Sequence, residues 1–195
     1  MNYKALIREV PDFPKPGILF YDITTLLKNA QAFRSIADEL AARYEGQRIE
    51  KIIGIESRGF IMGGTLAARL GAGFVPVRKP GKLPADIYEV EYNLEYGSSV
   101  LAIHRDAVSP GERVLIVDDL LATGGTAAAT IDLVRQLGGE IAGLDFLIEL
   151  KGLNGRDRLS GRNIAHELRL GVFDQLCCSI RYLRIVKLHL RNDLS

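Results

Sequence analysis

Apolar residues recur along the chain with the periods of helices and of buried strands in alternation. In residues 31–44 they lie three and four positions apart, which predicts a helix with one buried stripe. Short apolar runs predict strands at 51–55, 73–77, 113–117 and 141–150. Segments that end at glycines predict helices at 60–70 and 126–137. Strands that alternate with helices predict an α/β fold whose central, mostly parallel sheet is flanked by helices.

A different pattern, with a period of two, occupies residues 86–96. Apolar and aromatic side chains alternate there with polar ones, which is typical of a strand with one polar face. Gly97 and Ser98 turn the chain toward a second apolar run at 99–104. The two runs predict a hairpin beside the parallel sheet. Its approach, KPGKLP at 79–84, is rich in glycine and proline, so we interpret the hairpin as a lid.

Composition and charge narrow the classes of function. The 195 residues fit one globular domain, and a net charge of +1 with a pI near 7.8 offers no broad basic surface for nucleic acid or an anionic membrane. Cys177 and Cys178 are neighbours and give no disulfide framework, and no apolar run resembles a signal peptide or a membrane span. We expect a cytoplasmic protein without nucleic-acid or membrane partners. The three histidines lack ligand spacing, so no zinc site is expected.

The stretch VLIVDDLLATGGT at 114–126 carries the main candidate chemistry. After the strand, backbone amides would converge at a helix N-terminus, where unpaired N–H groups and the helix dipole favour a phosphate. Hydroxyl groups add donors, glycines let the backbone approach closely, and the residues concerned are Ala122, Thr123, Gly124, Gly125 and Thr126. Asp118 and Asp119 accept hydrogen bonds and suit ribose hydroxyls or hydrated Mg²⁺. The alternative is an ordinary turn with an Asp cap.

Several segments together resemble a known family. VLIVDDLLATGGT is similar to the phosphoribosyl-pyrophosphate (PRPP) signature of the type I phosphoribosyltransferases, and it matches neither the P-loop nor the dinucleotide fingerprint. Further segments narrow the resemblance to the adenine phosphoribosyltransferase family, in order DFPKPGILFYDIT, IESRGF, VRKPGKLP and LEYG. The resemblance covers about residues 10–170. It implies the type I fold as a single domain over 1–171, with a small N-terminal hood at 1–30 and a lid at 79–100.

The resemblance also implies an activity. Family members transfer ribose 5-phosphate from PRPP to N9 of adenine and release pyrophosphate, with Mg²⁺ carried largely on PRPP, here possibly near Asp118 and Asp119. They act as homodimers. Cations would neutralise the leaving pyrophosphate. The candidates are Arg58, Arg78, Lys79 and Lys82. A basic cluster can also be a solvated turn, but Arg58 follows a strand directly and is the leading candidate, with a catalytic role.

The remaining site residues come from the same resemblance. Glu95 matches the lid glutamate that acts as a general acid or base at the purine, and Tyr96 matches the lid tyrosine that helps to exclude water. Adenine would be read by an extended backbone with a stacking ring and a closing apolar side chain, at Leu19, Phe20, Tyr21 and Leu150. Many members carry a basic residue at the position of Tyr21, which puts the pocket rim in question. Without the resemblance, Phe20 could be core and Glu95 solvent-facing.

Two alternative functions remain at this point. A 6-oxopurine phosphoribosyltransferase would present a lysine to O6, and none stands at a matching place. A non-catalytic PRPP or purine-binding regulator of the same fold would need a second domain, for which the chain offers little room. Residues 172–195 form an atypical extension. Its apolar residues predict an amphipathic helix from about 176 to 190, with a strand as the alternative, that docks on the domain or a partner subunit.

Overall fold

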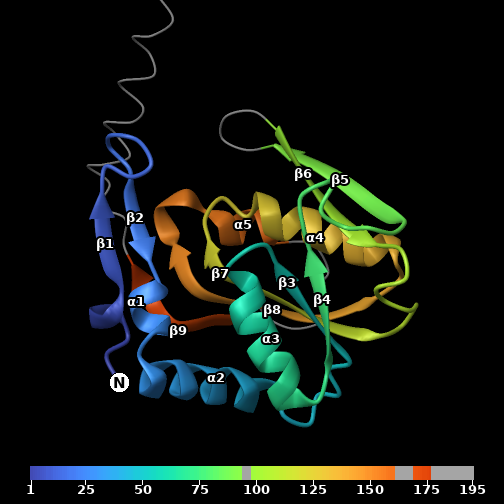
Figure 1. The fold of residues 1–195 in the computed structure, drawn as a ribbon, viewed down its shortest axis with the longest axis horizontal. Helices are drawn as coiled ribbons and strands as arrows, with labels where there is room; N and C mark the ends of the chain where they lie inside the picture. The colour runs from blue at the N-terminus through green and yellow to red at the C-terminus, as the bar shows by residue number, and fades with distance from the viewer. Residues whose placement is uncertain (94–97, 161–168, 177–195) are drawn as a thin grey trace, which may run out of the picture.

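A five-stranded parallel sheet forms the centre of the molecule. The structure, a computed structural model, describes residues 1–93, 98–160 and 169–176 (Figure 1). The strand order is β4-β3-β7-β8-β9. The strands are β3 (Lys51–Ile55), β4 (Gly73–Val77), β7 (Arg113–Leu121), β8 (Glu140–Leu150) and β9 (Arg169–Leu176). The α/β architecture expected from the sequence is confirmed.

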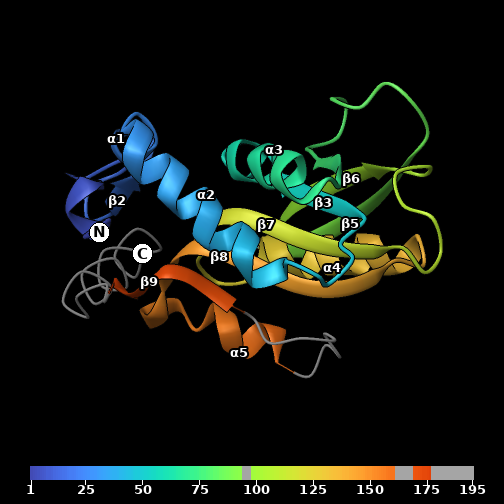
Figure 2. The same ribbon diagram turned by 90° about the horizontal axis from the view of Figure 1, so that it is seen from below.

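Helices cover both faces of this sheet. Figure 2 shows α2 (Ala30–Tyr44) and α3 (Gly59–Leu70) on one face and α4 (Gly125–Gln136) and α5 (Gly155–Leu159) on the other. The helix expected at 31–44 is present as α2, and the side chain of Asn29 caps it by accepting a hydrogen bond from the Ala32 amide at 3.0 Å. The short η2 (Lys151–Leu153) links β8 to α5.

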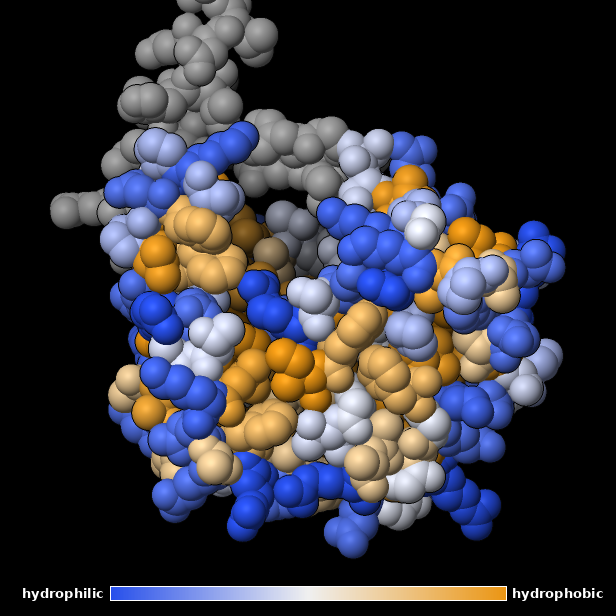
Figure 3. Space-filling view, viewed as in Figure 1, coloured by the Kyte–Doolittle hydropathy of each residue, from blue (hydrophilic) through white to orange (hydrophobic). Residues whose placement is uncertain are grey.

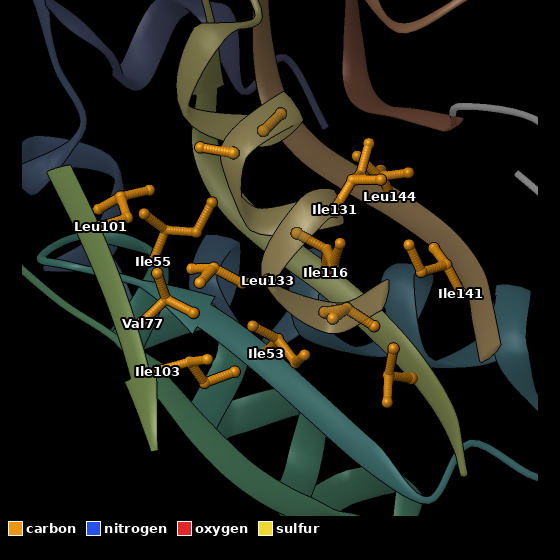
Figure 4. Close-up of a cluster of buried hydrophobic side chains, with 14 of the residues drawn as sticks. Ile53, Ile55, Val77, Leu101, Ile103, Ile116, Ile131, Leu133, Ile141 and Leu144 are labelled. Carbon is orange, nitrogen blue, oxygen red and sulfur yellow. The ribbon is translucent and has the colours of Figure 1, made fainter. Parts of the chain in front are cut away.

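Each face has its own hydrophobic core. One cluster lies between the sheet, α2 and α3, and it includes Ile36, Leu40 and Met62. The other joins the sheet to α4 and to the hairpin, and Figure 4 shows its branched side chains converging from β3, β4, β6, β7, β8 and α4. Burying one such side chain contributes about 1.5–3 kcal/mol to the stability of the fold, so these clusters are its main stabilising contribution. The sheet is thereby held rigid beneath the site.

The N-terminal segment forms a small hood beside the sheet (Figure 1). It contains η1 (Lys4–Leu6), β1 (Arg8–Pro11), β2 (Leu19–Asp22) and α1 (Thr24–Leu27), with β1 and β2 antiparallel. Tyr3, Ile23 and Leu26 are buried in the same core cluster as α2. The hood is therefore anchored to the domain, and β2 is held in a fixed place.

The expected hairpin is present as β5 (Ile87–Asn93) and β6 (Ser98–His104), which pair antiparallel. Tyr88, Val90 and Tyr92 pack partly buried against the core cluster that contains α4. A bridge between Arg78 and Ala102 ties the hairpin to the segment after β4. The tip, at 94–97, lies outside the described residues.

Two strands are longer than the sequence pattern indicated. β7 runs beyond 117 through both aspartates to Leu121, because Asp118 and Leu120 continue the pairing with β8. β9 crosses position 171, where the sequence analysis ended the domain, and Phe173 and Leu176 stand in register with Ile148 and Leu150. The extension thus begins within a strand of the central sheet. The helix expected from 176 onward lies outside the described residues.

Among the residues that the structure describes, no helix has both the length and the apolar character needed to cross a membrane.

Candidate active site

A cleft of about 470 Å³ opens at the carboxyl ends of β3 and β7. This is where ligands bind in sheets of this kind. Most of the residues assigned to PRPP line it together: Arg58, Lys79, Lys82, Asp118, Asp119, Ala122, Thr123, Gly124, Gly125 and Thr126. The hairpin adds Tyr92 and Leu101, which the sequence did not single out. Segments far apart in the chain therefore meet at the place predicted for the phosphates.

The loop from 122 to 124 connects β7 to α4 and faces the cleft. Gly124 takes a left-handed conformation, with φ of 75°, and its carbonyl accepts the amide of Ala128 at 2.9 Å as the first helical hydrogen bond. The first N–H groups of a helix have no partner within it, and they carry the positive end of its dipole. The loop and helix terminus could therefore receive an anion, and they are hereafter called the phosphate loop (residues 122–126).

Glycine is needed at two places here for reasons of packing. A Cβ on Gly124 would lie 2.6 Å from the carbonyl oxygen of Gly155, so the backbones of these two residues touch behind the loop. A Cβ on Gly59 would lie 2.8 Å from the Val117 carbonyl and 3.0 Å from an Asp118 oxygen. Gly59 at the start of α3 thus allows the segment between β3 and α3 (residues 56–58) to approach the acidic end of β7. For Gly124, a neighbouring backbone adds to the reason that the sequence suggested.

Asp118 and Asp119 lie side by side at the floor of the cleft but differ in their surroundings. Asp119 is buried and forms an ion pair with Arg58, and its amide donates to an Asp118 carboxylate oxygen at 2.9 Å. Burial, and next the charge of Asp119, raise the pKa of Asp118 well above its ordinary range. A cation or a hydroxyl donor would relieve this crowding of negative charge, so the pair suits a ribose diol or a hydrated metal ion.

Arg58 joins the acidic end of β7 to the hood. It stands directly before α3, pairs with Asp119, and its guanidinium lies over the ring of Phe20, 5.3 Å from the ring centre. Phe20 also contacts Phe13 edge-on, at 5.2 Å between ring centres. One cation therefore spans the distance between the acidic pair and the aromatic ring assigned to the base.

Glu56 is a cleft residue that the sequence analysis missed. Its carboxylate binds Arg78 at 3.1 Å and Lys82 at 2.6 Å, and these hydrogen bonds lower its pKa to about 2. Arg78 does not line the cleft; its guanidinium pairs with Glu56 and lies 5.9 Å from the ring centre of Phe60. The available signal was a carboxylate two residues before Arg58, in the IESRGF loop. Two of the four proposed pyrophosphate cations are thus organised by one acid.

The residues assigned to adenine lie beside the cleft, on β2 and β8. Strand alternation turns Phe20 toward Arg58 and turns Leu19 and Tyr21 toward the core, where Tyr21 is 5% exposed. The side chain of Tyr21 therefore does not form a pocket rim, and its backbone is the part left to read a base. Leu150 packs partly buried against the same core. Glu95 and Tyr96 lie outside the described residues.

Comparison with known proteins agrees with this geometry. The sequence profile of the phosphoribosyl transferase domain matches residues 22–160. The adenine phosphoribosyltransferase of Acidobacterium capsulatum is 65% identical over 155 residues, which cover 80% of this chain and 86% of that protein. The enzyme of the same name from Chloroflexus aurantiacus is 60% identical over 160 residues, covering 82% and 92%.

Solved structures give the same relation in three dimensions. The adenine phosphoribosyltransferase of Thermoanaerobacter pseudethanolicus is 53% identical, with a TM-score of 0.81 over 86% of this chain and 95% of that one. The yeast enzyme, from Saccharomyces cerevisiae, was crystallised with an imino-altritol bisphosphate and adenine; it is 40% identical, with a TM-score of 0.77 over 86% and 94%. By sequence and by fold, the chain belongs to the adenine phosphoribosyltransferase family of type I phosphoribosyltransferases.

Proposed function

We propose that this protein transfers ribose 5-phosphate from PRPP to N9 of adenine, giving AMP and pyrophosphate in purine salvage. The observation that carries the proposal is the juxtaposition of the phosphate loop, the acidic pair and Arg58 in one cleft. Hydrogen-bond donors for a phosphate at one end of the cleft, and hydrogen-bond acceptors for hydroxyl groups at the other, match a ribose 5-phosphate. The choice of adenine is supported by relatives of that name at 54–65% identity.

In this proposal the phosphate loop holds the 5-phosphate of PRPP, and Asp118 and Asp119 accept from the ribose hydroxyls. Arg58, Lys79 and Lys82 face the cleft, and Arg78 stands behind them on Glu56, so their charge stabilises the departing pyrophosphate. As the C1 to pyrophosphate bond breaks, the ribose acquires oxocarbenium character. Catalysis then depends on holding adenine N9 against C1 and on charge neutralisation rather than on a protein nucleophile.

The base is proposed to stack on Phe20 and to be read by the backbone of Leu19 to Tyr21, with Leu150 on its other side. Glu95 would exchange a proton at the imidazole edge of the purine, and Tyr96 would help to exclude water from C1. Exclusion of water matters because hydrolysis of PRPP competes with transfer. Support for the backbone reading comes from β2, whose Tyr21 side chain is committed to the core.

Mg²⁺ fits this site as a companion of the substrate. Within the described ranges no group of three or more His, Cys, Asp or Glu side chains could hold a metal, and Asp119 is already paired with Arg58. Two carboxylates suit a Mg²⁺ that keeps water and phosphate oxygens as its other ligands. When bound, the ion would neutralise charge on PRPP, and Asp118 is the residue of this chain best placed to receive it.

We also propose a cytoplasmic homodimer. An apolar patch formed by Phe60, Ile61 and Phe74 lies on α3 and β4, with Ile61 43% and Phe74 38% exposed; Figure 3 shows apolar side chains gathered over this region. The patch adjoins Arg78, whose guanidinium packs on Phe60. A second copy of the chain covering this patch would remove the apolar surface from water and bring basic residues near the partner's cleft.

The test is nucleotide formation with each base in turn. The protein is incubated with PRPP, Mg²⁺ and adenine, hypoxanthine, guanine or uracil, and nucleotide and pyrophosphate are measured by chromatography. Adenine should give AMP and pyrophosphate in equal amounts, with the other bases far poorer. Faster turnover of hypoxanthine would favour the 6-oxopurine alternative, and absence of turnover with every base would favour a binding regulator.

A further inference from the structure

The phosphate loop has a second face that does not look into the cleft. Gly155, the first residue of α5, is buried against this face. A Cβ built on Gly155 would lie 2.2 Å from the Ala122 carbonyl oxygen and 3.0 Å from the Gly124 amide nitrogen. Cβ atoms are not found so close to backbone atoms, so the present position of the loop requires glycine at 155.

The requirement comes from this contact rather than from the conformation of Gly155 itself. Gly155 is not among the residues with positive φ, whereas Gly124 has φ of 75°. An alanine at 155 could therefore adopt the backbone conformation without strain. It would act only by pushing on the phosphate loop, which makes the substitution selective.

Gly155 is held in place from two sides. Leu159, at the end of α5, is 3% exposed and belongs to the core cluster shared with α4. Arg156 makes two contacts of 3.4 Å with the carboxylate of Glu149, whose side chain is 6% exposed near the end of β8. The helix α5 is thus fixed to the sheet and to α4, and it forms a rigid support behind the loop.

We infer that Gly155 is a positioning residue for the 5-phosphate of PRPP. The inference rests on the proposed function, because it assigns the phosphate loop to that phosphate. A carbon atom stays about 3.3 Å or more from a carbonyl oxygen, so a methyl group at 155 displaces the loop by about 1 Å toward the cleft. Hydrogen-bond donors that hold a phosphate must lie within a few tenths of an ångström of their ideal place. A misplacement of 1 Å in an active site can lower the reaction rate about 100-fold.

The experiment compares Gly155→Ala with Gly73→Ala in the full chain. Gly73 is an exposed glycine at the start of β4 without positive φ, where the atom nearest to a Cβ belongs to the flexible side chain of Lys51, at 3.0 Å, and the Glu50 carbonyl oxygen lies at an ordinary contact distance of 3.7 Å. Calorimetry measures binding of ribose 5-phosphate and, separately, of magnesium pyrophosphate, and thermal melting confirms that each variant is folded. Steady-state kinetics then gives KM for PRPP and for adenine.

Gly155→Ala should weaken ribose 5-phosphate binding about 10-fold to 100-fold and raise KM for PRPP, while pyrophosphate affinity and KM for adenine change less than about twofold. Gly73→Ala should match the wild type. Unchanged ribose 5-phosphate binding in Gly155→Ala, or equal loss of both ligands, would overturn the inference. If that variant does not fold, Arg156→Gln decides, because freeing α5 from Glu149 should produce the same selective loss in smaller degree. Wild-type protein that fails to use PRPP would instead refute the proposed function.

Discussion

At the scale of single residues, charges in the cleft are held in pairs before any substrate arrives. Arg58 is paired with Asp119, and Arg78 and Lys82 are paired with Glu56. Pairing lowers the cost of keeping these groups partly out of water, and it fixes their positions in advance. In the proposed complex, binding of PRPP would therefore exchange these partners, and Arg58 and Lys82 would pass from a carboxylate to a phosphate oxygen.

This exchange predicts different kinetic effects for the acids of the site. Asp119→Asn keeps the shape of the side chain but removes the charge that orients Arg58, so KM for PRPP should rise about 10-fold to 100-fold. Glu95→Gln should lower kcat by a similar factor with PRPP affinity nearly unchanged, since the proposed role of Glu95 is at the base. Steady-state kinetics with calorimetry separates the two effects.

The control is Asp106→Asn, an exposed aspartate in the turn after β6, which should behave as the wild type. If Asp119→Asn and Glu95→Gln lose PRPP affinity equally, Glu95 acts on PRPP and its assignment to the purine is wrong.

At the scale of elements, helix α2 meets strand β8 through a buried carboxylate. Asp145 is 1% exposed, and burial raises its pKa to about 7 although Arg43 lies 3.4 Å away and favours the ionised form. The folded protein therefore holds a proton that the unfolded chain, with an ordinary Asp pKa near 4, releases. Where the folded state binds more protons, stability falls as pH rises.

We predict that ionisation of Asp145 lowers the free energy of unfolding of the wild type as pH rises from about 4 to about 7. The loss should reach roughly 4 kcal/mol at most. Asp145→Asn cannot ionise and should lack this loss. Urea unfolding of both proteins across this range measures the difference. The free energy of unfolding of the variant should increase relative to that of the wild type as pH rises, and parallel curves would contradict the assigned pKa.

The edge strand β9 gives a second prediction at this scale. Residues 172–176 continue a strand that pairs with β8, so a chain that ends at 171 loses part of the central sheet. Deletion of 172–195 should lower the melting temperature more than deletion of 177–195, because only the former removes ladder hydrogen bonds between β9 and β8. KM for adenine and PRPP should remain nearly unchanged in the shorter deletion. Equal melting temperatures for the two truncations would argue against β9 as a structural strand.

Some features of the site and of its strands could be predicted from the sequence, and others could not. The phosphate loop and the acidic pair are contiguous, so their local pattern was sufficient to identify them. β7 was expected to end at 117, because the carboxylates hid a pairing with β8 that continues to Leu121. The contact of Gly155 with the loop, and that of Glu56 with Arg78 and Lys82, join residues far apart in the chain. The position of Glu56, two residues before Arg58, could have marked it as a residue near the site, but the residue types do not show which partners it meets.

At the scale of the whole molecule, the exposed patch on α3 and β4 predicts association. Ile61→Lys places a charge at the centre of the proposed interface without touching the cleft, and it should shift a dimer toward monomer. Turnover should fall with dissociation if basic residues serve the adjacent subunit. Light scattering coupled to size exclusion, with activity measured on each fraction, tests this. A wild-type protein that is monomeric and fully active would refute the dimer, whereas Arg34→Lys at an exposed site of α2 should change neither property.

The proposed function requires that this cleft joins PRPP to adenine in preference to other bases. The most direct measurement is a competition in which equal concentrations of adenine, hypoxanthine and guanine share a limiting amount of PRPP with Mg²⁺, and the nucleotide products are resolved by chromatography. Since every base meets the same enzyme and the same PRPP, the product ratio reports the ratio of kcat/KM values directly. We predict AMP in large excess, with one pyrophosphate released for each AMP formed. A mixture dominated by the nucleotide of hypoxanthine or guanine would contradict it.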